Sequence, residues 1–117
     1  MRILRHIEVD KESRTDGRTI QRFVSENLTP SPESWLILTS QIPAGCIEQA
    51  HYHSDSMEVF YYLTPGSIEV GGTSYKLNTG DLVILEKEDV HRINAAEDMK
   101  LLVIKIPDVP DKVLVDK

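Results

Sequence analysis

The sequence predicts an all-β protein built as an antiparallel sandwich or barrel. Apolar residues recur with a period of two along most of the chain, which is the spacing of a half-buried strand. Nine or so short candidate strands follow one another at roughly 8–12 residue intervals, and turn residues separate them. No segment carries a helical stripe of any length, and 117 residues fit a single domain over 1–117.

The first half of the chain contains four candidate strands. Each is rich in β-branched, aromatic or alternating apolar residues, and turn or breaker residues separate them at Asp16-Gly17, Pro30-Ser31-Pro32 and Pro43-Ala44-Gly45. The predicted strands cover residues 3–9, 19–24, 35–39 and 47–53.

The second half shows the clearest pattern. Gly71-Gly72 separates two alternating runs, and paired glycines supply the positive φ angles of a tight hairpin without steric cost. Pro107 ends the last strong strand, and the tail 108–117 is expected to form an edge strand or a dimer contact. The predicted strands cover residues 57–63, 67–70, 73–77, 82–85, 91–94 and 100–106.

Composition excludes several classes of protein. The formal net charge of −6 is poorly suited to nucleic acid or an anionic membrane surface. No apolar run approaches the ~18 residues of a membrane span, and charges interrupt the first residues where an export signal needs an apolar stretch. The single cysteine, Cys46, excludes an intrachain disulfide and is expected to be structural. We therefore expect a cytoplasmic protein.

Three of the four histidines and one glutamate form a pattern suited to a metal ion. His51 and His53 lie two apart in a strand-like segment and so share a face, while Glu58 and His91 belong to other predicted strands. A string Gly-x5-His-x-His-x4-Glu is expected by chance on the order of once in a thousand chains. Three imidazoles and a carboxylate suit one divalent Mn, Fe, Ni, Cu or Zn ion, and on an octahedral metal they leave two positions open.

This pattern resembles the two motifs of the cupins. The first motif, G(X)5HXH(X)3,4E(X)6G, is matched from Gly45 through Glu58, and its last glycine, Gly66, arrives one residue late. The second, G(X)5PXG(X)2H(X)3N, keeps the spacing from Gly80 to His91, and only 13 residues separate Gly66 from Gly80. The resemblance covers about residues 36–106. It implies a jelly-roll, double-stranded β-helix barrel with His51, His53, Glu58 and His91 as metal ligands.

The second motif also departs from the family pattern. Glu86 stands at the proline position, Glu88 at a glycine position and Ala95 at the asparagine position. A glutamate is expected to avoid the positive φ that a glycine adopts, so Glu88 predicts an altered turn before His91.

Other residues are expected to surround the ion. Alternation from His51 places Ile47 and Gln49 on the inward face, so Gln49 is either a substrate contact or a polar group at the barrel mouth. Alternation from Glu58 adds Phe60 as apolar lining and Tyr62 as either a catalytic hydroxyl or a core aromatic. Ile93 shares the face of His91 and is expected to line the cavity. The residues expected in the core are Leu36, Leu38, Val83, Leu85, Val103 and Ile104.

The fold does not determine the function, and cupins include enzymes and binding modules. The favoured hypothesis is a metal-dependent oxidoreductase, dioxygenase-like, that acts on a small chelating substrate, with Glu58 moving protons. The alternatives are an isomerase or lyase on a sugar or small acid, with Tyr62 or Glu58 as base, and a non-catalytic small-molecule binding domain. By resemblance to small cupins we expect a homodimer, with 1–9 and Val113-Leu114-Val115 as interface segments.

Overall fold

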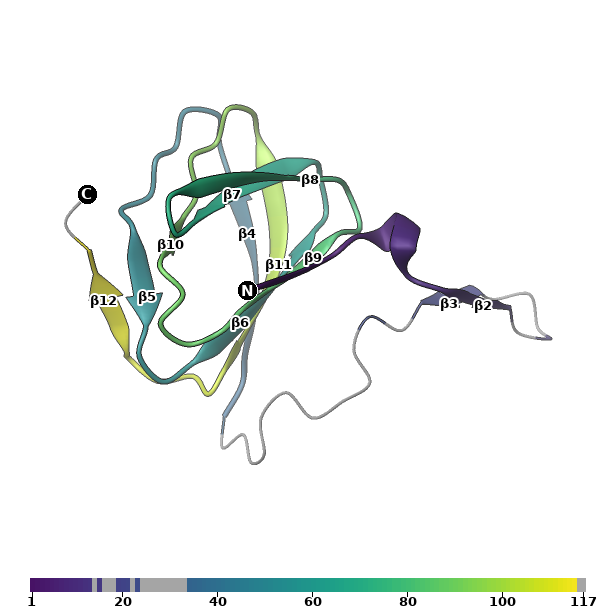
Figure 1. Ribbon diagram of the computed structural model, residues 1–117, viewed down its shortest axis with the longest axis horizontal. Coiled ribbons are helices and arrows are strands. Elements are labelled where there is room, and N and C mark those ends of the chain that lie inside the picture. Colours follow the sequence, from purple (N-terminus) through teal and green to yellow (C-terminus); the bar gives the residue numbers. More distant parts are fainter. Residues whose placement is uncertain (14, 16–18, 22, 24–33, 116–117) are drawn as a thin grey trace.

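Two five-stranded antiparallel sheets face each other in the computed structural model (Figure 1). The structure describes residues 1–13, 15, 19–21, 23 and 34–115. The first sheet has the order β1 (Arg2–Leu4), β9 (Leu82–Leu85), β6 (Met57–Tyr62), β11 (Met99–Ile106), β4 (Leu36–Ile42). The second has the order β12 (Lys112–Leu114), β5 (His51–His53), β10 (His91–Arg92), β7 (Gly66–Val70), β8 (Thr73–Leu77). The predicted all-β antiparallel architecture is confirmed.

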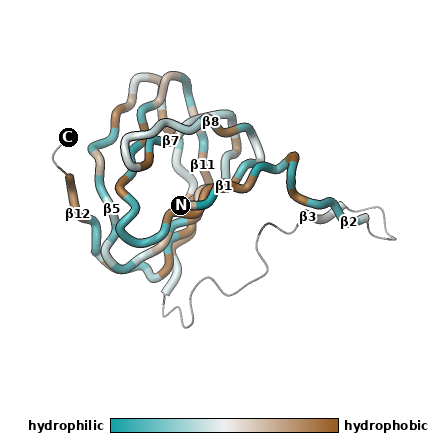
Figure 2. The backbone as a smooth tube through the Cα atoms, viewed as in Figure 1, coloured by the Kyte–Doolittle hydropathy of each residue, from teal (hydrophilic) through white to brown (hydrophobic). Residues whose placement is uncertain are grey.

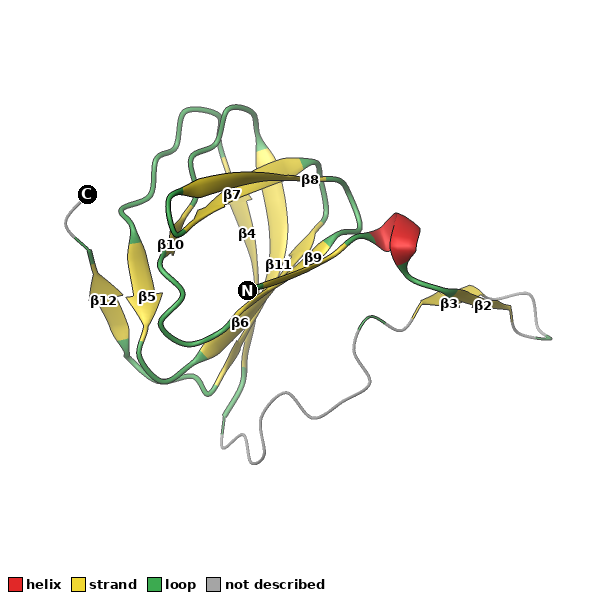
Figure 3. Ribbon diagram, viewed as in Figure 1, coloured by secondary structure: helices red, strands yellow, loops and turns green. Residues whose placement is uncertain are grey.

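A small extension lies outside these sheets. A 3-10 turn, His6–Glu8, leads from β1 to a two-stranded hairpin of β2 (Lys11–Ser13) and β3 (Thr19–Gln21), which projects away from the barrel (Figure 3). The sequence predicts one strand over 3–9, but the chain turns after Leu4 because the Glu8 amide bonds the Arg5 carbonyl. The predicted turns at 16–17 and 30–32 lie outside the described residues.

The core fills the space between the sheets. Side chains that alternate inward from β6, β9 and β11 meet others from β7, β8 and the segment after β10, as the period of two predicts. Val83, Leu85 and Val103 are buried as expected, whereas Leu38 is 38% exposed on the edge strand β4. The central cluster consists of Phe60, Tyr62, Ile68, Leu77, Val83, Leu85, Ile93, Ala95, Met99, Leu101 and Val103.

Glycines fix two of the connections. Gly71 and Gly72 both have positive φ, 58° and 84°, and join β7 to β8 in the predicted hairpin. At Gly66, at the start of β7, an added Cβ would lie 2.6 Å from the terminal methyl of Met99 and 3.1 Å from the Tyr62 ring, so a larger residue would require these side chains to shift. The late glycine of the first motif therefore lies at a closely packed position.

Two predictions about this region are wrong. The strand expected over 47–53 covers only His51–His53, because Ile47 pairs with Asn94 in an isolated bridge and is 65% exposed. Glu88 does adopt positive φ, 71°, and its amide donates to the His53 carbonyl at 2.8 Å. The turn thus keeps the conformation of the family's glycine position although a glutamate occupies it.

Candidate metal centre

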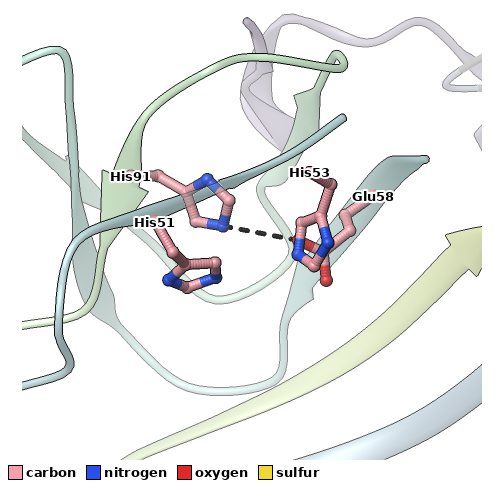
Figure 4. Close-up of side chains that lie close together, drawn as sticks. All are labelled: His51, His53, Glu58 and His91. Carbon is pink, nitrogen blue, oxygen red and sulfur yellow. Dashed lines mark ion pairs between the residues drawn. The ribbon is translucent and has the colours of Figure 1, made fainter. Parts of the chain in front are cut away.

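Four side chains from both sheets converge at one end of the core (Figure 4). His51 and His53 come from β5, His91 from β10 and Glu58 from β6. One nitrogen or oxygen atom from each lies within 4.8 Å of the others. His91 is paired with His51 in the strand register, and their ring centroids are 4.4 Å apart. The spacing of the sequence motif therefore translates into a compact cluster.

The atoms that face one another lack ordinary hydrogen-bond partners. Glu58 Oε1 lies 3.1 Å from His53 Nε2 and 3.4 Å from His91 Nε2. Neither contact has the geometry of a hydrogen bond. Within the described part of the chain, Glu58 Oε1 and His91 Nε2 are therefore buried without a hydrogen-bond partner. A buried polar atom without a partner is costly, so these two atoms are suited to binding a cation.

The opposite nitrogen of each imidazole is held by an acceptor. His51 Nδ1 lies 3.0 Å from the Gln49 carbonyl, and His91 Nδ1 lies 2.8 Å from the Asp89 carbonyl. Because a carbonyl oxygen only accepts, each Nδ1 carries the hydrogen and leaves the Nε2 lone pair free. This is the arrangement that orients metal-binding histidines in proteins.

His53 is held by a buried carboxylate, Asp111, which precedes β12. Asp111 Oδ1 accepts from His53 Nδ1 at 3.0 Å and from Lys105 Nζ at 3.1 Å. Its Oδ2 accepts from the amides of Asp55 and Ser56 at 2.8 and 2.7 Å. Burial alone would raise the pKa of Asp111, but these donors hold it well below the ordinary value.

Electrostatics couple the members of the cluster. Burial lowers the pKa of His51. Burial acts against the charged forms of Glu58 and His91 as well, yet their mutual contact prevails, lowering the pKa of Glu58 and raising that of His91. This contact therefore favours the charged forms of both side chains, and a metal ion would compete with a proton for His91 Nε2.

The residues fit a transition-metal ion. Donors bound roughly 2.1 Å from one ion lie about 3 Å apart when adjacent and about 4.2 Å apart when opposite, which is close to the observed spread. Neutral imidazoles and a carboxylate suit first-row divalent ions without selecting one of them. The unsatisfied Glu58 Oε1 and His91 Nε2 supply an independent sign of fit.

A cavity of about 160 Å³ opens beside the cluster. Phe60 and Ile93 line it, where the sequence places them, and Glu48 does so as well, although the sequence reasoning assigned no role to Glu48. The signal that could have identified Glu48 is weak, because the chain before His51 does not follow strand alternation. The residues lining the cavity are Leu38, Ser40, Ile42, Glu48, His51, Glu58, Phe60, His91, Ile93, Leu101 and Val103.

Two predicted site residues lie elsewhere. The Gln49 side chain is exposed and only its carbonyl reaches the cluster, through His51. Tyr62 is fully buried, and its hydroxyl donates to the Ser67 carbonyl at 3.1 Å, away from the cavity lining. Burial raises the pKa of Tyr62, so its hydroxyl stays protonated. Tyr62 thus occupies the core position that was the alternative to a catalytic role.

The family of the chain follows from this fold and motif together with a direct match. A family model described as Cupin domain matches residues 38–105, close to the 36–106 region in which the motifs lie. The chain belongs to the cupin family. A search of curated proteins found no match.

Solved structures share the fold at low identity. A protein with a double-stranded β-helix domain from Klebsiella pneumoniae superposes with a TM-score of 0.63 at 16% identity, covering 80% of this chain and 90% of its own. The DMSP lyase DddQ from Ruegeria pomeroyi gives 0.62 at 22% identity, covering 71% and 44%. A salicylate 1,2-dioxygenase from Pseudaminobacter salicylatoxidans gives 0.57 at 16% identity, covering 62% of this chain and 21% of that one. The chain thus spans about a fifth of the dioxygenase, and these likenesses show the fold alone.

None of the described helices has the length and apolar character needed to cross a membrane.

Proposed function

We propose that the protein is a mononuclear metal-dependent oxidoreductase, dioxygenase-like, that acts on a small chelating substrate. The observation that carries the proposal is the convergence of His51, His53, Glu58 and His91. Two of the converging atoms, Glu58 Oε1 and His91 Nε2, are buried without a hydrogen-bond partner among the described residues. A bound divalent ion would supply Lewis acidity and a template for substrate and dioxygen. The structural likeness to a salicylate 1,2-dioxygenase is consistent with this chemistry but does not select it.

The chain's own residues have defined parts in this proposal. The carbonyls of Gln49 and Asp89 and the carboxylate of Asp111 orient the three imidazoles. Phe60 and Ile93 exclude water from one wall of the cavity. Glu58 contributes the carboxylate that holds the ion.

The position of Tyr62 weighs against an isomerase that uses this residue as base. An isomerase or lyase needs a proton acceptor within hydrogen-bond reach of the substrate, and the Tyr62 hydroxyl is engaged with Ser67 in the core. Of the two residues that this hypothesis offers as a base, only Glu58 is left, and Glu58 is also a proposed metal ligand.

The first test measures metal binding. Metal-free protein should bind one equivalent of Fe(II), Mn(II), Co(II), Ni(II), Cu(II) or Zn(II), and His51→Ala or His91→Ala should weaken binding by roughly a hundredfold or more. His6→Ala is the matched control, because His6 lies outside the cluster and contacts Asp81. Unchanged affinity in His91→Ala would contradict the metal site.

The second test concerns the reaction. Oxygen uptake by Fe(II)-, Mn(II)-, Ni(II)- and Cu(II)-loaded protein with catechols and enediols should equal product formed without an added reductant, since a dioxygenase places both oxygen atoms in the product. Turnover without oxygen uptake would support an isomerase or lyase instead, and binding without turnover would support a binding domain.

We also propose that the protein forms a homodimer through exposed apolar edges. β12 ends the second sheet, and Val113 and Leu114 on it are 36% and 57% exposed, as the apolar colouring of this edge in Figure 2 illustrates. An exposed apolar edge strand favours pairing with another chain. Size-exclusion chromatography at the mass of one chain, 13.3 kDa, would contradict this proposal.

A further inference from the structure

The cavity beside the metal cluster has an unusual balance of charge. Its walls are mainly apolar, with Phe60, Leu101 and Val103 among them, and Ser40 adds one hydroxyl. Apart from the cluster residues, Glu48 is the only ionisable side chain among the described residues that line it. The ionisable side chain that the lining adds to the cluster is therefore a carboxylate and not a cation.

Glu48 is fixed in place by the backbone. Its Oε1 accepts from the Ile93 amide at 3.1 Å and lies 3.9 Å from His51 Nδ1. The Glu48 amide also donates to the Ile93 carbonyl at 2.8 Å, so the main chain holds the residue from both sides. The side chain lines the cavity and is 36% exposed, so solvent reaches part of it.

The nearby cations are engaged elsewhere or lie outside the cavity. Arg92 follows His91 but bonds Glu69 at 2.6 Å, and Lys105 bonds Asp111. Lys112 acts on His51 only through space and sits exposed on the edge strand β12. A cavity that recognised a carboxylate or phosphate would be expected to present such a cation to it.

The charges of the site cancel when it is loaded. A divalent ion bound by Glu58 and three neutral imidazoles would keep a net positive charge, and the Glu48 carboxylate offsets it. An anionic ligand would then gain little from the ion and would be repelled by Glu48, in a site of low polarity where charges interact strongly. An uncharged ligand escapes this repulsion.

We propose that Glu48 determines which ligand charge the site prefers. The site then binds small uncharged chelators, such as diols and enediols, and disfavours carboxylates and phosphates. This inference rests on the proposed metal-dependent function. The volume of about 160 Å³ sets the size, because a comparable apolar cavity of about 150 Å³ accommodates one benzene ring. The substrate class is thus a neutral compound of about one ring.

The test uses two chelators that differ in charge and hardly in shape. Picolinamide is neutral and picolinate is an anion, and both bind a metal through the ring nitrogen and one side-group atom. Each is titrated into Co(II)-loaded protein while the visible absorption of the ion is followed. Glu48→Gln removes the charge but keeps an oxygen to accept from the Ile93 amide, so the fold is preserved.

We expect Glu48→Gln to strengthen picolinate binding by roughly tenfold and to change picolinamide binding less than about twofold. Glu97→Gln, which removes an exposed carboxylate from a different surface hollow, should change neither. Equal strengthening of both chelators, or no change in picolinate binding, would overturn the role of Glu48. Failure of Co(II) to load would instead refute the metal site itself, so the two failures are distinguishable.

Discussion

Two largely enclosed carboxylates in this protein have opposite surroundings. Asp81, in the turn before β9, is fully buried and accepts from the amides of Asn78 and His6 at 2.7 and 2.9 Å and from Arg5 at 3.1 Å. Glu58, on β6, has an oxygen that is equally enclosed but receives no hydrogen bond from the described residues. The chain's own donors satisfy Asp81, whereas they leave Glu58 Oε1 without a hydrogen bond.

The difference shows how to separate structural from functional acids. The Asp81 side chain is fully buried and the Glu58 side chain is 12% exposed, so both are largely enclosed. The supply of donors distinguishes them, because a native structure rarely leaves a buried acceptor unpaired without a reason. Asp111 belongs with Asp81 by this criterion, since both its oxygens are occupied, yet one of its donors is a proposed metal ligand. Asp111 therefore resembles Asp81 in its hydrogen bonding and also contacts the proposed metal site through His53.

The largest effect in this comparison is expected for Asp111→Asn. An amide has one acceptor oxygen where the carboxylate has two, so contacts with His53, Lys105 or the Asp55 and Ser56 amides must be lost. Metal affinity should fall by about 10–100-fold, and stability should fall as well. Asp108→Asn, an exposed neighbour, is the control for isothermal titration with Zn(II). Unchanged affinity would confine Asp111 to a structural role.

Asp81→Asn should lower stability but not metal affinity. Replacing the carboxylate leaves Arg5 and two amides with a weaker acceptor, which costs about 1–3 kcal/mol of unfolding free energy. Chemical denaturation of metal-free protein measures the loss, and Zn(II) affinity should change less than about twofold. A large loss of Zn(II) affinity would show that the two regions are coupled.

The acid dependence of stability should follow the same residue. Burial raises the pKa of Asp81, but the amides of Asn78 and His6, with His6 and Arg5 side chains, lower it from 3.8 to about 2. A lowered folded-state pKa gives stability that is present above pH 3.8 and is lost as the pH falls through about 2, worth up to about 2 kcal/mol. Metal-free wild type should lose this increment on acidification and Asp81→Asn should not. Parallel acid profiles for the two proteins would contradict the assignment.

The smallest effect is expected at the turn that leads to His91. Positive φ at Glu88 costs about 1–2 kcal/mol for a residue with a side chain, and a glycine there would avoid this cost. Part of the gain would be cancelled because glycine loses more conformational entropy on folding. Glu88→Gly should therefore raise stability by roughly 0.5 kcal/mol and leave metal affinity unchanged, as measured by thermal unfolding and Zn(II) titration. Destabilisation would mean that the Glu88 side chain has a stabilising contact that outweighs the strain.

The sequence predicted the ligand cluster because the ligands follow local rules. His51 and His53 share a face by strand alternation. Glu58 and His91 lie at the spacing of the two motifs that resemble those of the cupins. The prediction that the Gln49 side chain faces inward is wrong, because the strand begins only at His51 and its alternation does not extend back to Gln49. Asp111 was missed because it reaches His53 only through the pairing of β12 with β5, and no local pattern specifies which strands pair. Glu88 shows that backbone conformation can persist after the residue that favours it has been replaced.

The pairing of His91 with His51 across β10 and β5 would make a bound metal ion a reporter of alignment between these strands. A shift of β10 by one residue relative to β5 would turn the His91 imidazole to the opposite face, away from His51, and would disrupt the site even in a compact chain. The rate at which metal binding recovers during refolding would therefore measure when two strands forty residues apart reach their native register. This rate can be compared with that of collapse of the apolar core.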